Sequence, residues 1–299
     1  MNRSGWIIYN GYLPSPAFLD FAEWLQQAAT AQAVTTTIYK NSELLAFLTG
    51  DQFDVLADDK EVLPDFVIFT DKDIYLARQL ELRGIRVFNS ARAIEASDDK
   101  ITTYQMLAQH KLPIPKTIIA PKQFGYQEDL DVNFAKKIHT YLSFPLIIKE
   151  AYGSFGEQVY LIKTEQQLQE KVRELSGIPY LFQEFIQSSY GKDIRLHVVG
   201  DNVVASMLRQ SQTDFRANVS AGGSMEAYQP TTVEKELAIA ATKAIGADFA
   251  GVDLLFGPEQ NPIICEVNSN AHIRNMYDCT GINVADEMIQ YIMESFKKE

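Results

Sequence analysis

Two short apolar runs separated by a turn constrain this chain more than any other stretch. Val252–Phe256 and Ile263–Val267 flank residues 257–262, whose glycine, prolines and asparagine are typical of a turn. This pattern predicts a β-hairpin. We take Phe256 to pair with Ile263, because this register closes the hairpin over the turn segment.

This register places Asp253 opposite Glu266, and strand alternation puts Asn268 on the same face as Glu266. Facing carboxylates repel, and a buried charge without a partner is costly, so a hard divalent cation is the simplest compensator. Oxygen ligands without a nearby pair of histidines or cysteines favour Mg²⁺ or Mn²⁺ over Zn²⁺. The wet face of an ordinary hairpin remains an alternative. Because carboxylate-bound Mg²⁺ usually leaves room for phosphates, the next question is whether a nucleotide site lies upstream.

Composition excludes several classes of protein. The chain of 299 residues is long enough for about two domains with a sizeable core. No stretch approaches the roughly 18 apolar residues of a membrane span, and the first ten residues are too polar for a signal peptide, so we expect a cytoplasmic protein without a membrane partner. The net charge of −12 argues against broad nucleic-acid binding.

The two cysteines, Cys265 and Cys279, show no zinc-type spacing. Alternation puts Cys265 with Ile263 and Val267, away from the carboxylates. We therefore expect Cys265 to be a reduced thiol in the core.

Residues 1–90 alternate between strand and helix patterns. Apolar runs predict strands at 6–9, 65–70 and 85–89, and apolar residues recur at helical spacing over 18–25 and 74–83. The alternation predicts a small α/β domain with a largely parallel sheet. No Gly-x-Gly-x-x-Gly follows its first strand, so we assign it a structural or substrate-facing role and no dinucleotide.

Two lysines lie beside segments suited to phosphate. Ser97 is the expected N-cap of a helix that begins near Lys100, where a lysine opposes the helix dipole unless an anion lies beside it. Lys149 ends an apolar run and precedes Gly153-Ser154-Phe155-Gly156, whose glycines let backbone N–H groups approach an anion. The loop is not a P-loop, because Gly-Lys-[Ser/Thr] is absent. A solvated Lys100 and a plain hairpin with an exposed Lys149 remain alternatives.

Polar residues between positions 180 and 223 complete the candidates. The apolar strand pattern of Tyr180–Ile186 contains Gln183 and Glu184, and its backbone edge suits an adenine, although a plain core strand is the alternative. The four histidines are scattered, so none is assigned to catalysis or metal. In the next predicted strand, alternation places Asp193 and Arg195 on one face. A later polar loop that ends in glycine contains Arg216 and Asn218.

As an ensemble these residues resemble the ATP-grasp enzymes, and among them the RimK-like amino-acid (α-L-glutamate) ligases. The resemblance runs from about residue 90 to the end of the chain. It rests on motifs in family order and spacing: Asp99-Lys100, Lys149 with Gly153–Gly156, Gln183–Ile186, Asp193-Ile-Arg195, Phe215–Asn218 with Gly222-Gly223, and Asp253 with Glu266-Val-Asn268.

The resemblance implies an ATP-grasp fold of the α/β (α+β) class. An N-terminal α/β pre-ATP-grasp domain would cover residues 1–90, a lid subdomain 91–187, and a C-terminal sheet subdomain with a metal site 188–299. ATP would lie between the last two.

The resemblance also implies a role for each motif. The two lysines would contact the ATP phosphates under the glycine-containing loop, Glu184 and Ile186 would bracket the adenine, and Asp193 would hold the ribose. The implied ATP-binding residues are Lys100, Lys149, Gly153, Ser154, Phe155, Gly156, Gln183, Glu184, Phe185, Ile186, Asp193, Arg216 and Asn218. Lys149, Arg216 and Asn218 are the catalytic candidates, the last two facing the transferred phosphate. Two Mg²⁺ (or Mn²⁺) ions would be carried by Asp253, Glu266 and Asn268.

The implied activity is that of an ATP- and Mg²⁺-dependent carboxylate–amine ligase, which forms an acyl phosphate that an amine attacks to give an amide. Such phosphoryl transfer needs positioning and charge neutralisation more than a covalent residue, which agrees with the absence of a nucleophile motif. The expected partners are an amino-acid donor, glutamate or another, and a peptide or small-molecule acceptor; a homo-oligomer is left open. The alternative is a nucleotide-binding regulatory or scaffold protein of the same fold without turnover.

Two departures from the family pattern affect the substrate side. RimK-like ligases commonly carry an arginine before the glycine pair, where this chain has Ala221, and Ser-Pro-Gly after the metal-binding asparagine, where it has residues 269–274. Arg195 and Arg274 are the substrate-binding candidates for an anionic amino acid or peptide carboxylate. A surface residue at a loop end is the alternative for Arg274. We expect acceptor preference to differ from that of ligases that modify ribosomal-protein tails.

Overall fold

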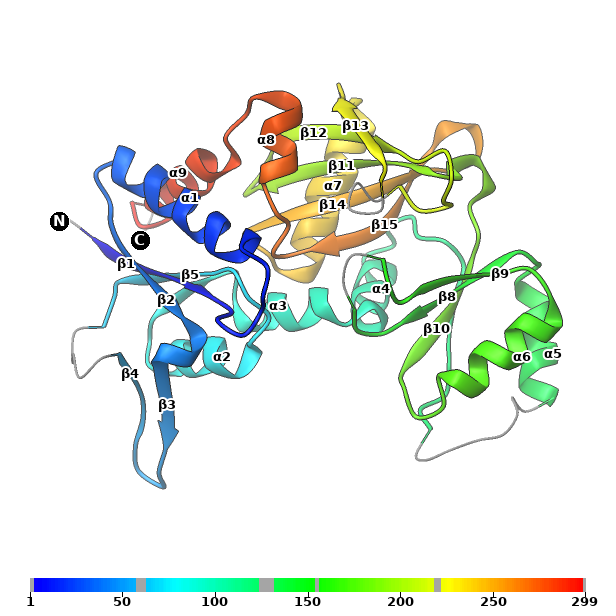
Figure 1. The fold of residues 1–299 in the computed structure, drawn as a ribbon, viewed down its shortest axis with the longest axis horizontal. Helices are drawn as coiled ribbons and strands as arrows, with labels where there is room; N and C mark the ends of the chain where they lie inside the picture. Colours follow the sequence, from blue (N-terminus) through cyan, green and yellow to red (C-terminus); the bar gives the residue numbers. More distant parts are fainter. Residues whose placement is uncertain (1–2, 58–62, 124–131, 154–155, 218–221, 298–299) are drawn as a thin grey trace.

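The structure is a computed structural model that describes residues 3–57, 63–123, 132–153, 156–217 and 222–297 (Figure 1). The predictions for Ser154, Phe155 and Asn218, and the departure at Ala221, fall outside these residues. The described chain forms a four-stranded N-terminal sheet, a four-stranded middle sheet, a five-stranded C-terminal sheet and a two-stranded hairpin. The mixed α/β class is therefore as predicted.

The N-terminal sheet is parallel, with strand order β2-β1-β5-β6. Its two faces are apolar and buried, because α1 (Ala17–Ala31) covers one face and α2 (Ile74–Leu82) the other. The strands are β1 (Ser4–Tyr9), β2 (Thr35–Lys40), β5 (Phe66–Phe69) and β6 (Arg86–Phe88).

The sequence patterns missed β2 and the hairpin of β3 (Leu44–Leu48) and β4 (Phe53–Ala57), which follows the 3-10 turn Asn41–Glu43. β2 has the sequence Thr-Thr-Thr-Ile-Tyr-Lys and contains no apolar run, because it lies at the edge of the sheet with Thr35, Thr37 and Lys40 exposed. Its β-branched threonines were the available signal.

The middle sheet is antiparallel, with order β7-β10-β8-β9, and α5 (Val132–Tyr141) and α6 (Glu165–Glu174) pack on it. We call this unit the lid. In Figure 1 the lid lies at the opposite end of the molecule from the N-terminal sheet. Its strands are β7 (Thr117–Ile119), β8 (Leu146–Glu150), β9 (Val159–Ile162) and β10 (Tyr180–Glu184).

The C-terminal sheet is antiparallel, with order β13-β12-β11-β14-β15. Its apolar face packs against α4 (Lys100–Gln109) and α7 (Thr232–Ile245). A capping box between Thr231 and Glu234 begins α7, and Gly246, at φ +76°, ends it. The strands are β11 (Lys192–Val199), β12 (Asn202–Gln210), β13 (Ser224–Ala227), β14 (Phe249–Phe256) and β15 (Pro262–Asn268). Short 3-10 turns span Gln187–Ser189 and Pro258–Gln260.

The helices α8 (Arg274–Thr280) and α9 (Val284–Ser295) return the chain to the N-terminal domain, where both join the apolar cluster of α1. Within the described ranges, no helix is both long and apolar enough to cross a membrane. The predicted domain boundaries at residues 90 and 187 stay a prediction.

Two local expectations were wrong. The Asp253–Glu266 pairing is confirmed, but a β-bulge follows Asp253, so Phe256 pairs with Pro262 instead of Ile263. Ser97 is not an N-cap, because α3 (Ala91–Asp98) runs through it. The N-cap of α4 is Asp99, the residue directly after α3, and its carboxylate accepts from the Ile101 backbone N–H at 2.9 Å.

Asn89 joins the N-terminal and C-terminal sheets. Its buried side chain follows β6 and bonds backbone groups at the start of β14 and after β15. Nδ2 donates to the carbonyls of Phe249 and Ser269, both at 2.9 Å, and Oδ1 accepts from the N–H groups of Asp248 at 2.6 Å and Phe249 at 3.2 Å. One side chain thus satisfies four backbone groups.

We expect Asn89→Ala to lower the free energy of unfolding by about 2–4 kcal/mol, because buried backbone groups would lose their partners. The matched control is Asn261→Ala, which removes a single exposed bond of 3.3 Å in the β14–β15 turn and should cost under about 1 kcal/mol. Urea unfolding of both variants measures the difference. Equal losses would show that Asn89 does not tie the sheets together.

Candidate active site

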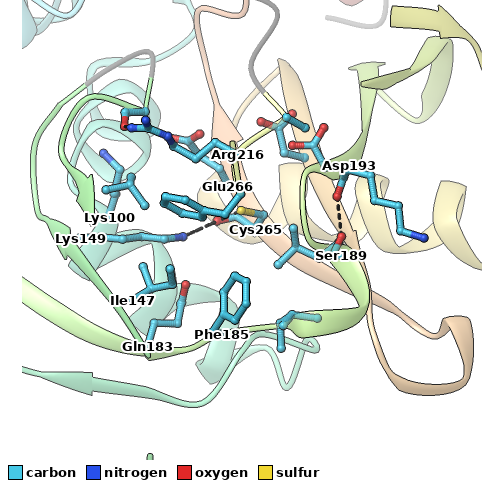
Figure 2. Close-up of a pocket in the computed structure, with 18 of the residues that line it drawn as sticks. Lys100, Ile147, Lys149, Gln183, Phe185, Ser189, Asp193, Arg216, Cys265 and Glu266 are labelled. Atoms are coloured by element: carbon cyan, nitrogen blue, oxygen red, sulfur yellow. Dashed lines mark hydrogen bonds between the residues drawn. The ribbon is translucent and has the colours of Figure 1, made fainter. Parts of the chain in front are cut away.

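A cleft lies between the lid and the C-terminal sheet (Figure 2). It holds about 890 Å³ of empty space, including open solvent at its mouth. The structure brings twelve predicted site residues to its lining: Lys100, Lys149, Gly153, Gly156, Gln183, Glu184, Phe185, Ile186, Asp193, Arg216, Asp253 and Glu266. Apolar lining that the sequence motifs did not identify comes from Ile147, Val159 and Leu255, beside Phe215 of the motif at residues 215–218.

Two lysine ammonium groups lie in the cleft. Lys100, in the first turn of α4, donates from Nζ to the Gly153 carbonyl at 3.0 Å. Lys149, on β8, donates to the Tyr104 hydroxyl at 2.8 Å. Burial lowers the pKa of Lys100, and the carboxylate of Glu266 acts against this shift. Burial also lowers the pKa of Lys149, but the Cys265 and Tyr104 side chains outweigh it, so that this pKa lies above its usual value. Lys149 is therefore a buried cation.

Arg216 connects the loop after β12 to the lid. Its guanidinium binds Asp214 through Nε at 3.0 Å and Nη2 at 2.8 Å, and Nη1 donates to the Gly156 carbonyl. The hydrogen bond from Arg216 lowers the pKa of Asp214, so the pair stays charged. The arginine is thereby held at the mouth of the cleft beside the glycine-containing loop.

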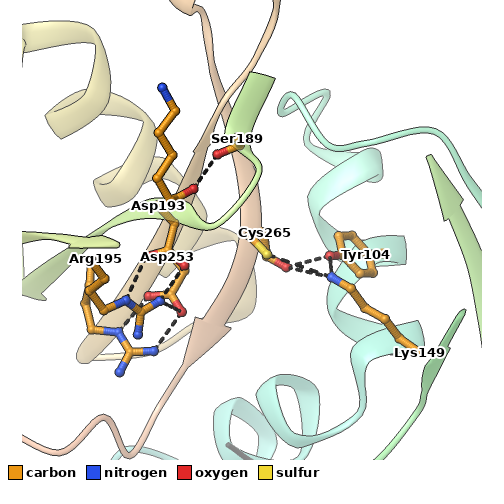
Figure 3. Close-up of polar contacts among 9 residues, drawn as sticks. Tyr104, Lys149, Ser189, Asp193, Arg195, Asp253 and Cys265 are labelled. Carbon is orange, nitrogen blue, oxygen red and sulfur yellow. Dashed lines mark hydrogen bonds and ion pairs between the residues drawn. The ribbon is translucent and has the colours of Figure 1, made fainter. Parts of the chain in front are cut away.

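On the sheet side of the cleft, two arginines and two aspartates form an ion network in which Asp193, Asp253 and Arg209 are buried (Figure 3). Arg195 binds Asp253 with two bonds of 2.6 and 2.7 Å, and Arg209 binds Asp193 with two bonds of 2.7 Å. Arg209 also reaches Asp253 at 2.8 Å. Although burial raises the pKa of Asp253, the two guanidinium groups outweigh this effect and hold it at about 2. We call these four residues the ion network.

The ion network adds guanidinium partners for Asp253 that the expected cation site did not include, and the metal-binding role of Asp253 stays a prediction. Arg209 was missed by the sequence patterns. It lies opposite Asp193 only because a bulge follows His197 in β11 and shifts the register with β12.

Glu266 and Asn268 are the predicted metal ligands whose side-chain oxygens remain available to a divalent cation. Within the described part of the chain, no side chain or backbone group donates a hydrogen bond to the Glu266 carboxylate or to the amide oxygen of Asn268. Their oxygens suit Mg²⁺, whereas Asp253 would have to share its oxygens with Arg195 and Arg209. Among the described residues, no three His, Cys, Asp or Glu side chains gather as a metal site.

Four residues lie elsewhere than expected or outside the cleft lining. Asn268, a predicted metal ligand, follows Glu266 in β15 but is not among the lining residues. Cys265 does not point away from the carboxylates: at the bulge it lines the cleft beside Glu266, with Sγ 3.9 Å from Lys149 Nζ. Arg195 lies within the ion network. Arg274 binds Asp20 of α1 at 2.6 Å and lies over the Trp24 ring at 4.2 Å, on the surface. The substrate-binding roles of the two arginines stay predictions.

Comparison with known proteins agrees with this architecture. A family model described as the RimK-like ATP-grasp domain matches residues 97–292. The "Uncharacterized protein MG012 homolog" of Mycoplasma pneumoniae is 35% identical over 289 residues, which cover 93% of this chain and 97% of that protein. The "Probable alpha-L-glutamate ligase 1" of Shewanella sp. (strain W3-18-1) is 37% identical over 220 residues, which cover 73% of this chain and 70% of that protein.

Solved structures show the same fold at low sequence identity. The D-Ala:D-Ser ligase VanG of Enterococcus faecalis superposes with a TM-score of 0.75 at 18% identity, covering 98% of this chain and 99% of that one. The ATP-grasp ligase PsnB, complexed with a precursor variant, Mg and ADP, superposes with a TM-score of 0.70 at 17% identity, with the same coverage. The family match spans well over half of the chain, and these likenesses extend its fold through the N-terminal domain. This chain therefore belongs to the RimK-like ATP-grasp family of carbon–nitrogen ligases.

Proposed function

We propose that this protein is an ATP- and Mg²⁺-dependent carboxylate–amine ligase that adds an amino acid, such as glutamate, to a peptide or small molecule. The observation that carries the proposal is the joint placement of Lys100, Lys149 and Glu266 in one cleft. Two buried ammonium groups suit the phosphates of a nucleotide, and a carboxylate without a protein partner suits the cation that accompanies them. The named relatives support the choice of glutamate and of a peptide acceptor.

The nucleotide would lie along the lid side of the cleft. The chain at the end of β10 offers the backbone edges of Glu184 and Ile186 to the adenine, and the apolar side chains of Ile147 and Leu255 suit its faces. Asp193 lies in the lining next to this end and would meet the ribose. The lysines would then hold the phosphates farther along the cleft.

The proposed chemistry transfers the γ-phosphoryl group of ATP to a carboxylate oxygen of one substrate and releases ADP. The amine nitrogen of the second substrate then forms the C–N bond as phosphate leaves and the nitrogen loses a proton. The chain's own part is positioning: Lys100 and Lys149 hold the phosphates, and Arg216 stabilises negative charge on the transferred group. Mg²⁺ held through Glu266 and Asn268 would neutralise phosphate charge.

The test is a screen of amino-acid donors with peptide and small-molecule acceptors, followed by ADP release and product mass spectrometry. ADP release that requires both substrates, with an amide product of matching mass, supports the ligase. Tight ATP binding without ADP release for any pair would overturn it in favour of a nucleotide-binding scaffold.

We expect Glu266→Gln to reduce ADP release at least about 100-fold, because loss of one anionic ligand weakens cation binding beside the phosphates. The midpoint of thermal unfolding should not fall, since the Glu266 carboxylate has no described partner and faces Asp253. Glu259→Gln, in the exposed turn of the same hairpin, is the matched control and should change neither quantity. Wild-type turnover in Glu266→Gln would remove this residue from the metal site.

Arg209→Met should both destabilise the fold and weaken nucleotide binding, because it leaves Asp193 and part of Asp253 buried without a cation. We expect the free energy of unfolding to fall by about 3–5 kcal/mol. Arg78→Met, which removes an exposed pair with Glu95, should cost no more than about 1 kcal/mol. Urea unfolding of the two variants measures this, and similar losses in both would show that the ion network does not support the sheet.

A further inference from the structure

The Tyr104 hydroxyl lies at a junction of the lid, α4 and the C-terminal sheet. The side chain is 4% exposed. Its oxygen accepts from Lys149 Nζ at 2.8 Å and lies 2.5 Å from the Cys265 carbonyl oxygen, to which it can donate (Figure 3). Gln183 Oε1, at 3.3 Å, is a second acceptor for the same hydrogen. A hydroxyl has one hydrogen, and an ammonium group only donates. The ammonium of Lys149 therefore donates to the hydroxyl, and the hydroxyl donates to the Cys265 carbonyl or to Gln183.

Neutral groups alone hold the Lys149 ammonium in the described part of the chain. Besides Tyr104, its nearest polar neighbour is the Cys265 carbonyl at 3.5 Å, and it lies 5.2 Å from the centre of the Tyr104 ring. No described carboxylate lies within ion-pair distance of it. This differs from the ion network, where every guanidinium is neutralised by a carboxylate. The charge of Lys149 thus remains available to an anion in the cleft.

Without the Tyr104 hydroxyl, the Lys149 ammonium could pair with the Glu266 carboxylate instead. Glu266 follows Cys265 directly in β15, lines the same cleft and has no described partner, and its charge attracts Lys149. A flexible lysine side chain also loses considerable rotamer freedom when it is held in one place. The hydrogen bond to Tyr104 both orders the ammonium before a ligand arrives and keeps it from pairing with Glu266.

The phenol ring and the hydroxyl have separable roles. The ring packs with Leu107 and Leu181 in the apolar cluster beneath the C-terminal sheet. Replacing tyrosine by phenylalanine keeps this packing and removes only the group that contacts Lys149. The substitution therefore isolates the polar contact.

We propose that Tyr104 is a positioning residue that acts through Lys149: its hydroxyl holds the ammonium where the phosphates of ATP bind. This inference rests on the proposed function. It makes a prediction about phosphate recognition alone, because the adenine would meet other residues of the cleft.

The experiment measures the affinity of Tyr104→Phe for a non-hydrolysable ATP analogue with Mg²⁺ and for adenosine, the latter by competition against a fluorescent adenine nucleotide. We expect about a tenfold loss for the analogue and no change for adenosine. Tyr160→Phe is the matched control, since Tyr160 donates to Glu150 at 2.6 Å in the lid. It should bind both ligands like the wild type.

A double-mutant cycle with Lys149→Ala separates positioning from a structural effect. In the Lys149→Ala background, Tyr104→Phe should cause no further loss of analogue affinity. Equal losses for the analogue and adenosine, an undiminished loss without Lys149, or wild-type analogue affinity in Tyr104→Phe would each overturn the inference. If the wild-type protein binds neither ligand, the proposed function fails and this inference fails with it.

Discussion

The architecture of the site depends on the buried contact between Arg209 and two aspartates of neighbouring strands. Two guanidinium groups and two carboxylates balance one another, so three buried charges and the half-buried Arg195 can share one face of the C-terminal sheet. Apolar residues of the same strands, such as Ile194 and Leu254, face the opposite side and pack against α7. The sheet can therefore present a charged face to the cleft and an apolar face to the core.

This balance gives the cleft an uneven charge distribution. On the sheet side, the carboxylates of Asp193 and Asp253 are already paired. On the lid side and at the base of α4, Lys149 and Lys100 are held by neutral oxygens, and Glu266 is left without a described partner. Figure 2 shows these three groups around one opening. Such an arrangement suits a polyanion bound together with a divalent cation. The polyanion would neutralise the two lysines, and the cation would neutralise Glu266.

The segment after the predicted metal ligands serves as an interdomain contact. Asn270 donates to the Asp71 carbonyl, just after β5, at 2.6 Å, His272 packs edge-on against Phe18, and Arg274 binds Asp20. This is where the chain departs from the Ser-Pro-Gly common in the family. The altered residues bind the N-terminal domain, and with Asn89 they fix how that domain meets the site.

Local sequence patterns determined most strands, the pairing of Asp253 with Glu266, and the cleft residues that the family motifs identify. They did so because periodicity, turn residues and cross-strand pairing act over a few residues. The sequence patterns did not identify the edge strand β2, because its exposed residues are polar and leave no apolar periodicity to detect. Tertiary structure decided which side chains face the charged groups of the cleft, because two β-bulges shift the strand register. If the pairing of Val199 with Asn202 continued unbroken, Leu208 would lie opposite Asp193. The bulge brings Arg209 there instead, and the bulge beside Asp253 turns Cys265 toward Lys149. A one-residue shift in register moves a side chain to the other face of a strand. Only the packing of the complete sheet selects the register that forms.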